Sequence, residues 1–406
     1  MNIPCGIKRE VPLLDCKRLR ICIVATVPMP LNVFMMHHIR ELSKKYQVTL
    51  VANGTENDVR AMLNDNVIFS HIRIERKISL LRDVSALYAL WRLFRAERFH
   101  CVHSLMPKSG LLAMIAAWFA RVPIRIHLFT GQVWATRRGV VRCAMKSLDK
   151  VVALCASHLL TDSYSQQQYL VDEGVAARER LTVLCDGSVC GVDMARFMPH
   201  ARKRHAIRLR YGIPDDAIVA LYLGRLTREK GVPELLFAFS LAAERCDKLH
   251  LFVVGPDEEG VRISHVDIIC RMKDRVHFDN FTQEPESYMA AADFFVMPSH
   301  REGFGLTIIE AAACGIPSVG TRIYGLIDAI VDGDTGILVP VGDSMALADA
   351  MVHLSECSDH RYALGVKAMR RVENSFQAQR LADSMREYYS KILCESELCS
   401  CVKCGG

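Results

Sequence analysis

Short segments that are almost continuously apolar recur along the chain, and each is followed by a segment with helical spacing. Residues 19–27 are the clearest such strand, and residues 33–46 after them show helical spacing. The pattern restarts in the second half, where an apolar strand over 217–223 precedes a helix over 232–244. A strand that is apolar on both faces belongs to a parallel sheet with helices on both sides. The alternation predicts an α/β fold, and its restart predicts two Rossmann-like domains.

The remaining predicted strands are short apolar runs that end at turn or polar residues. They lie at residues 47–52, 67–74, 101–103, 124–128 and 150–153 in the first half, and at 249–254, 276–278, 293–297, 316–320 and 336–339 in the second. A helix is expected over 79–94, with one face formed by Leu80, Val84, Leu87, Trp91 and Phe94.

The length of the chain also favours two domains, because 406 residues exceed what one compact core usually organises. We place the domains at residues 18–195 and 196–375, followed by a last helix over 376–393 with Ser375 as its N-cap. Residues 394–406 form a tail that contains cysteines at positions 394, 399, 401 and 404. Their spacing does not match the paired C-x2-C units of a zinc ribbon, so a disordered tail without a metal is expected.

Basic residues are concentrated in the first half of the chain. The net charge is +6, but residues 71–150 hold fifteen Lys or Arg and four Asp or Glu, which gives +11 in this segment. Anionic lipid, a diphosphate-bearing substrate or nucleic acid would each suit such a segment, and so would an ordinary solvated surface. Apolar stretches such as residues 109–120 are shorter than the ~20 residues that a membrane span needs. A soluble or peripheral protein is expected.

The sixteen cysteines raise the question of disulfides. Residues 1–17 contain no apolar run long enough for a secretory signal, so we expect the reducing cytosol. Cysteines such as Cys22, Cys101 and Cys155 lie within apolar runs and are expected to act as small hydrophobic residues.

The strongest chemical signal is a pair of glutamates, Glu302 and Glu310, on either side of a glycine-containing turn. Gly303, Phe304 and Gly305 follow an apolar strand and precede a helix that begins with Leu306 and Thr307. Open α/β sheets bind ligands at the carboxyl ends of their strands, and a helix N-terminus there suits a diphosphate. Glu310, one turn into the helix, is placed to accept hydrogen bonds from ribose hydroxyls, and Glu302 is placed to reach a transferred sugar.

A second anion-binding signal follows the strand over 217–223. Gly224, Arg225 and Lys230 lie in the turn that leads to the next helix. Both cations can converge on one anionic group, where they would stabilise the negative charge that develops on a leaving nucleoside diphosphate. Such a pair would make a divalent metal unnecessary, so no metal and no cofactor other than the nucleotide-sugar substrate is expected.

These two motifs, in this order, resemble those of the family 4 glycosyltransferases, which are retaining enzymes with the two-domain GT-B fold. The resemblance covers nearly the whole chain and is densest over residues 291–321. It implies that Arg225 and Lys230 bind the donor diphosphate and that Glu302 and Glu310 bind the sugar and the ribose. It also implies an N-terminal acceptor domain, a C-terminal donor domain, and a last helix that returns to the N-terminal domain.

The segment from His127 to Gly139 resembles the branch that acts on polyprenyl-diphosphate-linked sugars, including transferases of N-acetylgalactosamine, in bacterial glycan assembly. The donor is then expected to be UDP-linked and to carry an N-acetylhexosamine or a hexose. Where many members have a His-Gly pair, this chain has Thr130-Gly131. On the acceptor or membrane side we therefore also consider the side chains of His103, His127, Trp134, Arg137 and Arg138.

The resemblance implies a cytoplasmic protein that is peripheral on the inner membrane and has no nucleic-acid partner. Trp134, Arg137 and Arg138 are the expected contacts with an anionic membrane surface. Same-face attack is the implied retaining mechanism, with Glu302 positioning the sugar. Two alternatives stay open: another enzyme on the same fold, such as a nucleotide-sugar 2-epimerase or a glycan phosphorylase, and a non-catalytic scaffold of a glycan assembly complex.

Overall fold

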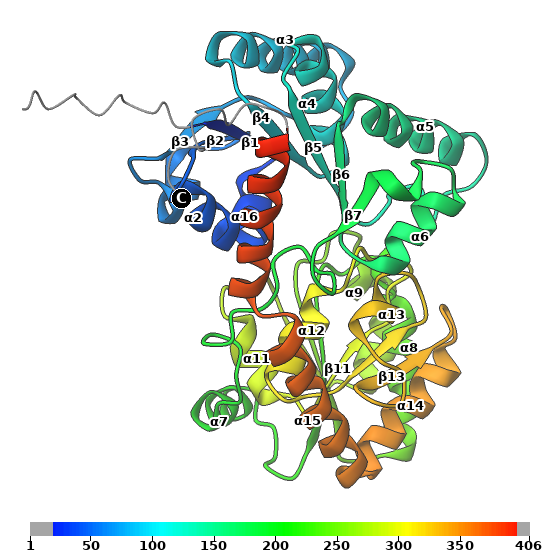
Figure 1. Ribbon diagram of the computed structural model, residues 1–406. Coiled ribbons are helices and arrows are strands. Elements are labelled where there is room, and N and C mark those ends of the chain that lie inside the picture. Colours follow the sequence, from blue (N-terminus) through cyan, green and yellow to red (C-terminus); the bar gives the residue numbers. More distant parts are fainter. Residues whose placement is uncertain (1–18, 396–406) are drawn as a thin grey trace, which may run out of the picture.

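The computed structural model describes residues 19–395 and contains two parallel sheets, one in each half of the chain (Figure 1). Within these residues, the N-terminal sheet has seven strands in the order β3-β2-β1-β4-β5-β6-β7. Their bounds are β1 Arg20–Val24, β2 Gln47–Ala52, β3 Val67–His71, β4 Cys101–Leu105, β5 Ile124–Phe129, β6 His158–Thr161 and β7 Leu181–Val183.

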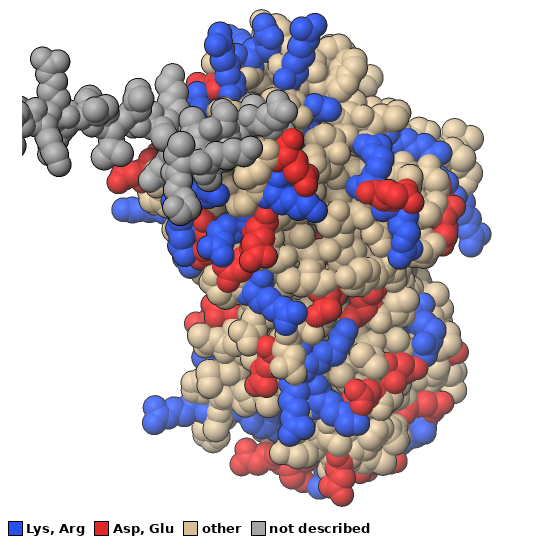
Figure 2. All heavy atoms as spheres, viewed as in Figure 1, with Lys and Arg blue, Asp and Glu red and all other residues tan. Residues whose placement is uncertain are grey.

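The C-terminal sheet has six strands in the order β10-β9-β8-β11-β12-β13, counted over the described residues. Their bounds are β8 Ile218–Leu223, β9 Leu249–Val254, β10 Val276–Asp279, β11 Phe294–Met297, β12 Ser318–Thr321 and β13 Gly336–Val339. The two sheets form separate domains, and the molecule narrows between them (Figure 2). The predicted pair of Rossmann-like domains is therefore confirmed.

Helices cover both faces of the N-terminal sheet, and each face has its own core. One core joins the sheet to α2 (Met36–Ser43) and α16 (Ala378–Glu395). The other joins it to α3 (Leu80–Glu97), α4 (Pro107–Phe119) and α5 (Gly139–Cys155). The remaining helical segments of this half are α1 Pro28–Pro30, the π-helical Leu31–Met35, the 3-10 segments Glu56–Met62 and Arg178–Arg180, and α6 Tyr164–Asp172.

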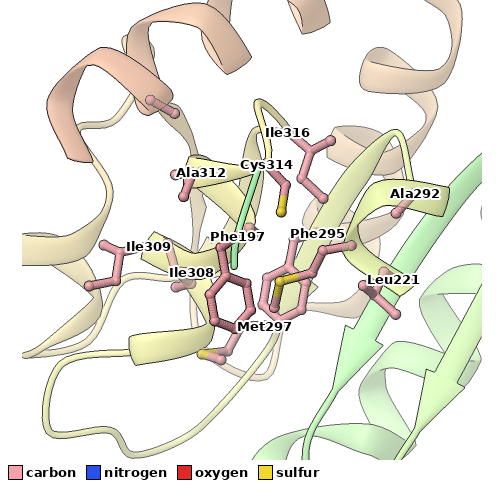
Figure 3. Packing of buried hydrophobic residues seen from close by; sticks show 14 of the residues in the cluster. Phe197, Leu221, Ala292, Phe295, Met297, Ile308, Ile309, Ala312, Cys314 and Ile316 are labelled. Carbon is pink, nitrogen blue, oxygen red and sulfur yellow. The ribbon is translucent and has the colours of Figure 1, made fainter. Parts of the chain in front are cut away.

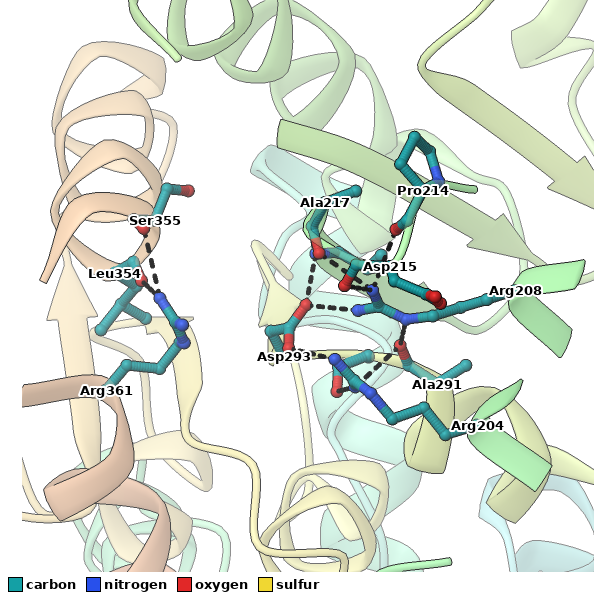
Figure 4. A network of polar contacts seen from close by, with 12 residues as sticks. Arg204, Arg208, Pro214, Asp215, Ala217, Ala291, Asp293, Leu354, Ser355 and Arg361 are labelled. Carbon is teal, nitrogen blue, oxygen red and sulfur yellow. Dashed lines mark hydrogen bonds and ion pairs between the residues drawn. The ribbon is translucent and has the colours of Figure 1, made fainter. Parts of the chain in front are cut away.

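The C-terminal domain repeats this layered design around Phe295 of β11, which packs with Phe197 and Ile308 (Figure 3). Asp293, just before β11, accepts bonds from Arg204 and Arg208 and from the Val219 amide, which ties α7 to the sheet (Figure 4). The helices of this domain are α7 Ala201–Arg210, the 3-10 segment Arg228–Lys230, α8 Val232–Arg245, α9 Val261–Ser264, α10 Val266–Arg271, α11 Pro285–Ala291, α12 Leu306–Ala313, α13 Leu326–Ala329, α14 Ser344–Glu356 and α15 Ser358–Ser375.

The chain passes between the domains at two adjacent points. Val192 donates to the Phe376 carbonyl at 2.7 Å, and Ala378 donates to the Val192 carbonyl at 2.9 Å. The backbones approach so closely that a Cβ on Gly191 would lie 2.5 Å from the Phe376 oxygen. After this crossing α16 packs on the N-terminal domain beside α2, which confirms the predicted returning helix (Figure 1).

Three local predictions were wrong. Residues 150–153 continue α5, and the strand expected there lies instead at His158–Thr161, because a short apolar run fits a helix and a strand equally well. Ser375 ends α15 and does not cap α16, which begins at Ala378. On the predicted face of α3, Phe94 is buried, whereas Leu80 and Val84 are exposed to solvent.

Candidate active site

A cavity of about 390 Å³ lies between the domains, at the carboxyl ends of strands from both sheets. This is the edge at which open α/β sheets bind ligands. The N-terminal side of the cavity is lined by Phe34, Met106, Pro107, Thr130, Gly131, Val133, Asp162, Ser188, Val189 and Cys190. The C-terminal side is lined by Arg225, Lys230, Arg301, Glu302, Gly303, Phe304, Gly305 and Leu306.

The loop between β11 and α12 forms one wall of the cavity. Gly305, the N-cap of α12, has φ +92°, and a Cβ on it would lie 2.6 Å from Leu326 Cδ2, so only glycine fits without strain. The turn directs the N-terminus of α12 into the cleft at Leu306. Amide N–H groups and the positive end of the helix dipole make this position suitable for a phosphate.

The loop after β8 brings two cations to the same cavity, as predicted. Lys230 Nζ lies 2.5 Å from Glu302 Oε1, and Arg225 Nη1 lies 2.9 Å from Glu258 Oε2. Glu302 Oε1 also accepts a hydrogen bond from the Ser299 hydroxyl at 2.8 Å. Arg225, Lys230 and Glu302 therefore surround one space and can act together on a single ligand. A diphosphate bound by the two cations would take the place of their carboxylate partners.

Glu310 occupies the predicted position one turn into α12, but neither it nor Thr307 lines the cavity. Its side chain is partly buried, and burial raises the pKa of its carboxyl to about 8, with Arg196 acting in the opposite direction. Within residues 19–395, no donor lies at hydrogen-bond distance from this carboxyl. Its hydrogen-bonding capacity is therefore available to a ligand.

Asp162 is a cavity residue that the sequence analysis missed. It follows β6 directly, is buried, and its Oδ1 has no partner among the described residues. Burial raises the pKa of its carboxyl well above the ordinary value, which favours the neutral acid over the carboxylate. A polar residue directly after an apolar strand would have indicated a site residue. The sequence analysis missed it because it placed that strand at 150–153.

Arg301 is a second missed residue and connects the two domains across the cleft. Its guanidinium pairs with both carboxylate oxygens of Glu229 at 2.8 and 2.7 Å and donates to the Gly131 carbonyl at 2.7 Å. A bidentate pair of this kind holds the side chain in one orientation. Arg301 thereby fixes the C-terminal wall of the cavity against the loop that contains Thr130 and Gly131.

His103 and His127 do not reach the cavity, and the expectation that they act on the acceptor side is wrong. His103 is buried with its Nδ1 2.7 Å from the Tyr389 hydroxyl, and His127 is buried with its Nδ1 2.8 Å from Ser104 Oγ. Burial lowers the pKa of each imidazole to about 3, so both are neutral at physiological pH. They are core residues of the N-terminal sheet, whereas Thr130 and Gly131 line the cavity as expected.

Trp134 is also a core residue, so its expected contact with a membrane is wrong. Its indole is 1% exposed, donates to Asp149 Oδ2 at 2.7 Å, and stacks on Tyr169. A buried indole N–H needs a hydrogen-bond partner, and Asp149 provides one for Trp134 inside the core. Arg137 and Arg138, just before α5, are exposed.

The described residues contain no group of three or more His, Cys, Asp or Glu side chains that could hold a metal ion. Cys394 is exposed on α16, and Cys399, Cys401 and Cys404 lie outside the described residues. Among the helices of residues 19–395, none is long and apolar enough to cross a bilayer.

Two family profiles match the chain, one in each domain. The profile described as "Glycosyl transferase 4-like domain" matches residues 31–187, and "Glycosyl transferases group 1" matches residues 203–371. The chain is 30% identical over 334 residues to the capsular polysaccharide biosynthesis glycosyltransferase CapM of Staphylococcus aureus, covering 82% of this chain and 87% of the relative. It is 25% identical to the UDP-Gal:alpha-D-GlcNAc-diphosphoundecaprenol alpha-1,3-galactosyltransferase of Escherichia coli, covering 77% and 81% of the two chains.

Solved structures with the same arrangement of two domains cover almost the whole chain. HepE of Anabaena in complex with UDP-glucose superposes with a TM-score of 0.77 at 17% identity, covering 92% of this chain and 100% of that one. Sucrose-phosphate synthase of Thermosynechococcus elongatus superposes with a TM-score of 0.78 at 21% identity, covering 93% and 100%. At these identities the likeness establishes the GT-B fold.

Proposed function

This chain belongs to the group 1 glycosyltransferases, and from that premise we propose that it transfers a sugar from a UDP-linked donor to a polyprenyl-diphosphate-linked saccharide. The transferred sugar would be an N-acetylhexosamine or a hexose, and the product a bacterial surface or glycoprotein glycan. The acceptor class is supported by the relative that is named for a diphosphoundecaprenol-linked substrate. The UDP donor is supported by the UDP-glucose complex of a protein with the same fold.

The observation that carries this proposal is the convergence of Arg225, Lys230 and Glu302 on one interdomain cavity. The two cations and the N-terminus of α12 would bind the donor diphosphate and stabilise it as it leaves. We propose that these groups suffice without a divalent metal. Glu302, which accepts a hydrogen bond from Ser299, would position the sugar and stabilise its positive charge in the transition state.

We propose retention of the anomeric configuration through same-face attack. A double displacement needs an ionised carboxylate opposite the leaving group. Asp162 is the carboxyl on the N-terminal wall of the cavity, and burial raises its pKa, which disfavours the ionised form that a nucleophile needs. The departing diphosphate would then accept the proton of the acceptor hydroxyl, and Asp162 would serve as a hydrogen-bond group toward the sugar.

The acceptor class places the reaction at a bilayer, so we propose that the protein works on the cytoplasmic face of the inner membrane. A donor screen by mass spectrometry against a polyprenyl-diphosphate-linked saccharide tests the function, and NMR of the product gives the anomeric configuration. Release of free sugar without an acceptor would indicate an epimerase-like enzyme instead. Failure of every donor to react would favour a non-catalytic scaffold.

A further inference from the structure

Helix α3 exposes an apolar face that no other part of the described chain covers. Leu80, Leu81, Val84, Tyr88 and Trp91 are all exposed, with Leu81 88% accessible. At 3.6 residues per turn, these five side chains fall within an arc of about 100°. The adjoining side of the helix is buried against the domain core. The helix is therefore apolar on two sides, which an ordinary solvated surface helix is not.

Helix α5 and the end of α4 extend this apolar surface. Val140 and Leu154 of α5 are 85% and 75% accessible, and Leu148 between them is exposed too. Trp118 and Phe119, the last two residues of α4, are exposed and pack edge to face on each other. Isolated exposed apolar residues are normal, but a surface that gathers them on three neighbouring helices is unusual for a soluble monomer.

The three helices lie on the same side of the molecule. Their buried residues belong to one core on one face of the N-terminal sheet, and α4 packs against both α3 and α5. Their outer faces therefore lie on the same side of the sheet, opposite α2 and α16. We call the exposed residues of α3, α5 and the end of α4 the docking surface.

The part of the chain that carries the docking surface has an excess of basic over acidic residues. Residues 71–150 contain fifteen basic and four acidic residues. The four carboxylates are all engaged: Glu75 by Arg73 and Arg82, Asp83 by Lys108, Glu97 by Arg20, and Asp149 by the Trp134 indole. Basic side chains such as Arg92 and Arg95 remain exposed on α3, where Lys and Arg gather over the top of the domain (Figure 2).

We propose that the docking surface binds an anionic lipid bilayer. Apolar side chains would enter the headgroup region while the surrounding cations bind lipid phosphates, as interfacial amphipathic helices do. A second copy of the chain is a poorer occupant, because a symmetric contact would bring two surfaces with an excess of basic residues together. This inference extends the proposed function, which requires an acceptor held in a membrane, and replaces Trp134 with an exposed surface as the site of attachment.

The docking surface also leads to the cavity. Thr136, three residues before α5, donates to Glu229 of the C-terminal domain at 3.3 Å, and Glu229 pairs with the cavity residue Arg301. The N-terminus of α5 therefore lies beside the mouth of the cleft. A bilayer bound to α5 would bring lipid phosphates to that mouth, where the diphosphate of the proposed membrane-held acceptor would have to enter.

Sedimentation of the full-length protein with vesicles tests the inference without any sugar substrate. The vesicles contain phosphatidylcholine alone or with 30% phosphatidylglycerol. Two variants remove one property each: Leu81→Gln/Val140→Gln removes apolar area, and Arg92→Gln/Arg95→Gln removes charge. The control variant Ile263→Gln/Tyr362→Gln changes two apolar residues of the C-terminal domain that are 82% and 75% exposed.

We expect the wild type and the control to bind anionic vesicles and to release them as salt rises. The arginine variant should bind about thirtyfold more weakly, from about fivefold for each charge near the surface, and the apolar variant at least about tenfold more weakly. UDP-glucose affinity should not change in either variant.

Equal binding of all four proteins, or equal binding to neutral and anionic vesicles, would overturn the inference. So would a dimer in light scattering that the Leu81→Gln/Val140→Gln substitutions abolish, because a second copy would then occupy the surface. Turnover of a polyprenyl-linked acceptor dissolved in detergent tests the proposed function separately. Loss of vesicle binding with normal turnover in detergent would leave the proposed function intact.

Discussion

Replacing Glu310 with glutamine should stabilise the free protein while weakening its use of the donor. Burial raises the pKa of this carboxyl from 4.5 to about 8, so at pH 7 the folded protein holds a proton there that the unfolded chain has released. A carboxyl with a raised folded-state pKa lowers stability progressively as pH rises from its unfolded to its folded pKa. Over the about 2.5 pH units between 4.5 and 7, at about 1.36 kcal/mol per unit, the cost reaches at most about 3.4 kcal/mol.

Glutamine keeps the shape of the side chain and does not titrate. Glu310→Gln should therefore unfold at higher urea concentration than wild type at pH 7 and 8, and the difference in unfolding free energy should shrink toward zero near pH 4.5. Circular dichroism follows the unfolding transition at each pH. Glu244→Gln, an exposed glutamate of the same domain, serves as the control and should leave stability unchanged at every pH.

The Glu310→Gln substitution should weaken donor binding, although it stabilises the fold. Ribose hydroxyls bond more strongly to a carboxylate than to a neutral group, so wild-type affinity for UDP-glucose should increase between pH 7 and 9 while that of Glu310→Gln stays flat. The loss in kcat/KM at pH 8 should be about five- to thirtyfold, or about 1–2 kcal/mol. A variant that is no more stable than wild type at pH 7 and has the same pH dependence would refute the reasoning.

Three further predictions concern the cavity. Arg225→Ala and Lys230→Ala should each lower kcat/KM by an amount equivalent to ~2–4 kcal/mol of lost transition-state stabilisation, without unfolding the protein. Near wild-type turnover of the double variant would show that the donor diphosphate binds at another place. Turnover should persist in excess EDTA, because two cations and a helix N-terminus stabilise the leaving group. A complete loss of turnover that manganese restores would contradict the proposed metal independence. Asp162→Asn should keep kcat within about tenfold of wild type, since a carboxyl group and an amide of the same shape can both form hydrogen bonds to the sugar, whereas a loss beyond about 10⁴-fold would indicate a nucleophile.

Except for β6 and β7, the strands of both sheets were predictable, because burial on both faces requires continuous apolar runs such as 217–223 and 249–254. The turn chemistry around Gly303 and Gly305 was also predictable, since a strand, a glycine turn and a helix follow one another without interruption. These features depend on local sequence. The same local information gave the positions of Arg225, Lys230 and Glu302 at the carboxyl edge of the C-terminal sheet.

The acceptor side was harder to predict because its residues are defined by long-range packing. His103 is held by Tyr389, 286 residues away, and nothing near either residue in the sequence indicates that contact. Trp134 is buried and donates its indole N–H to the carboxylate of Asp149, which lies three turns into α5. Asp162 was missed because the strand before it was predicted at 150–153, whereas it lies at His158–Thr161. Asp162 is a candidate site residue because it directly follows a strand.

The adjacent crossings at Val192 and Phe376 make the C-terminal domain an insertion within the N-terminal one. Residues 193–376 begin and end at the same place, so a related domain can replace them with two cuts that leave both segments of the N-terminal domain paired through α16 and α2. Recombination at this point would exchange the donor-side loops and keep the acceptor-side walls and the outer helices unchanged. Chains with this connection can thus exchange the whole C-terminal domain while the N-terminal domain stays unchanged.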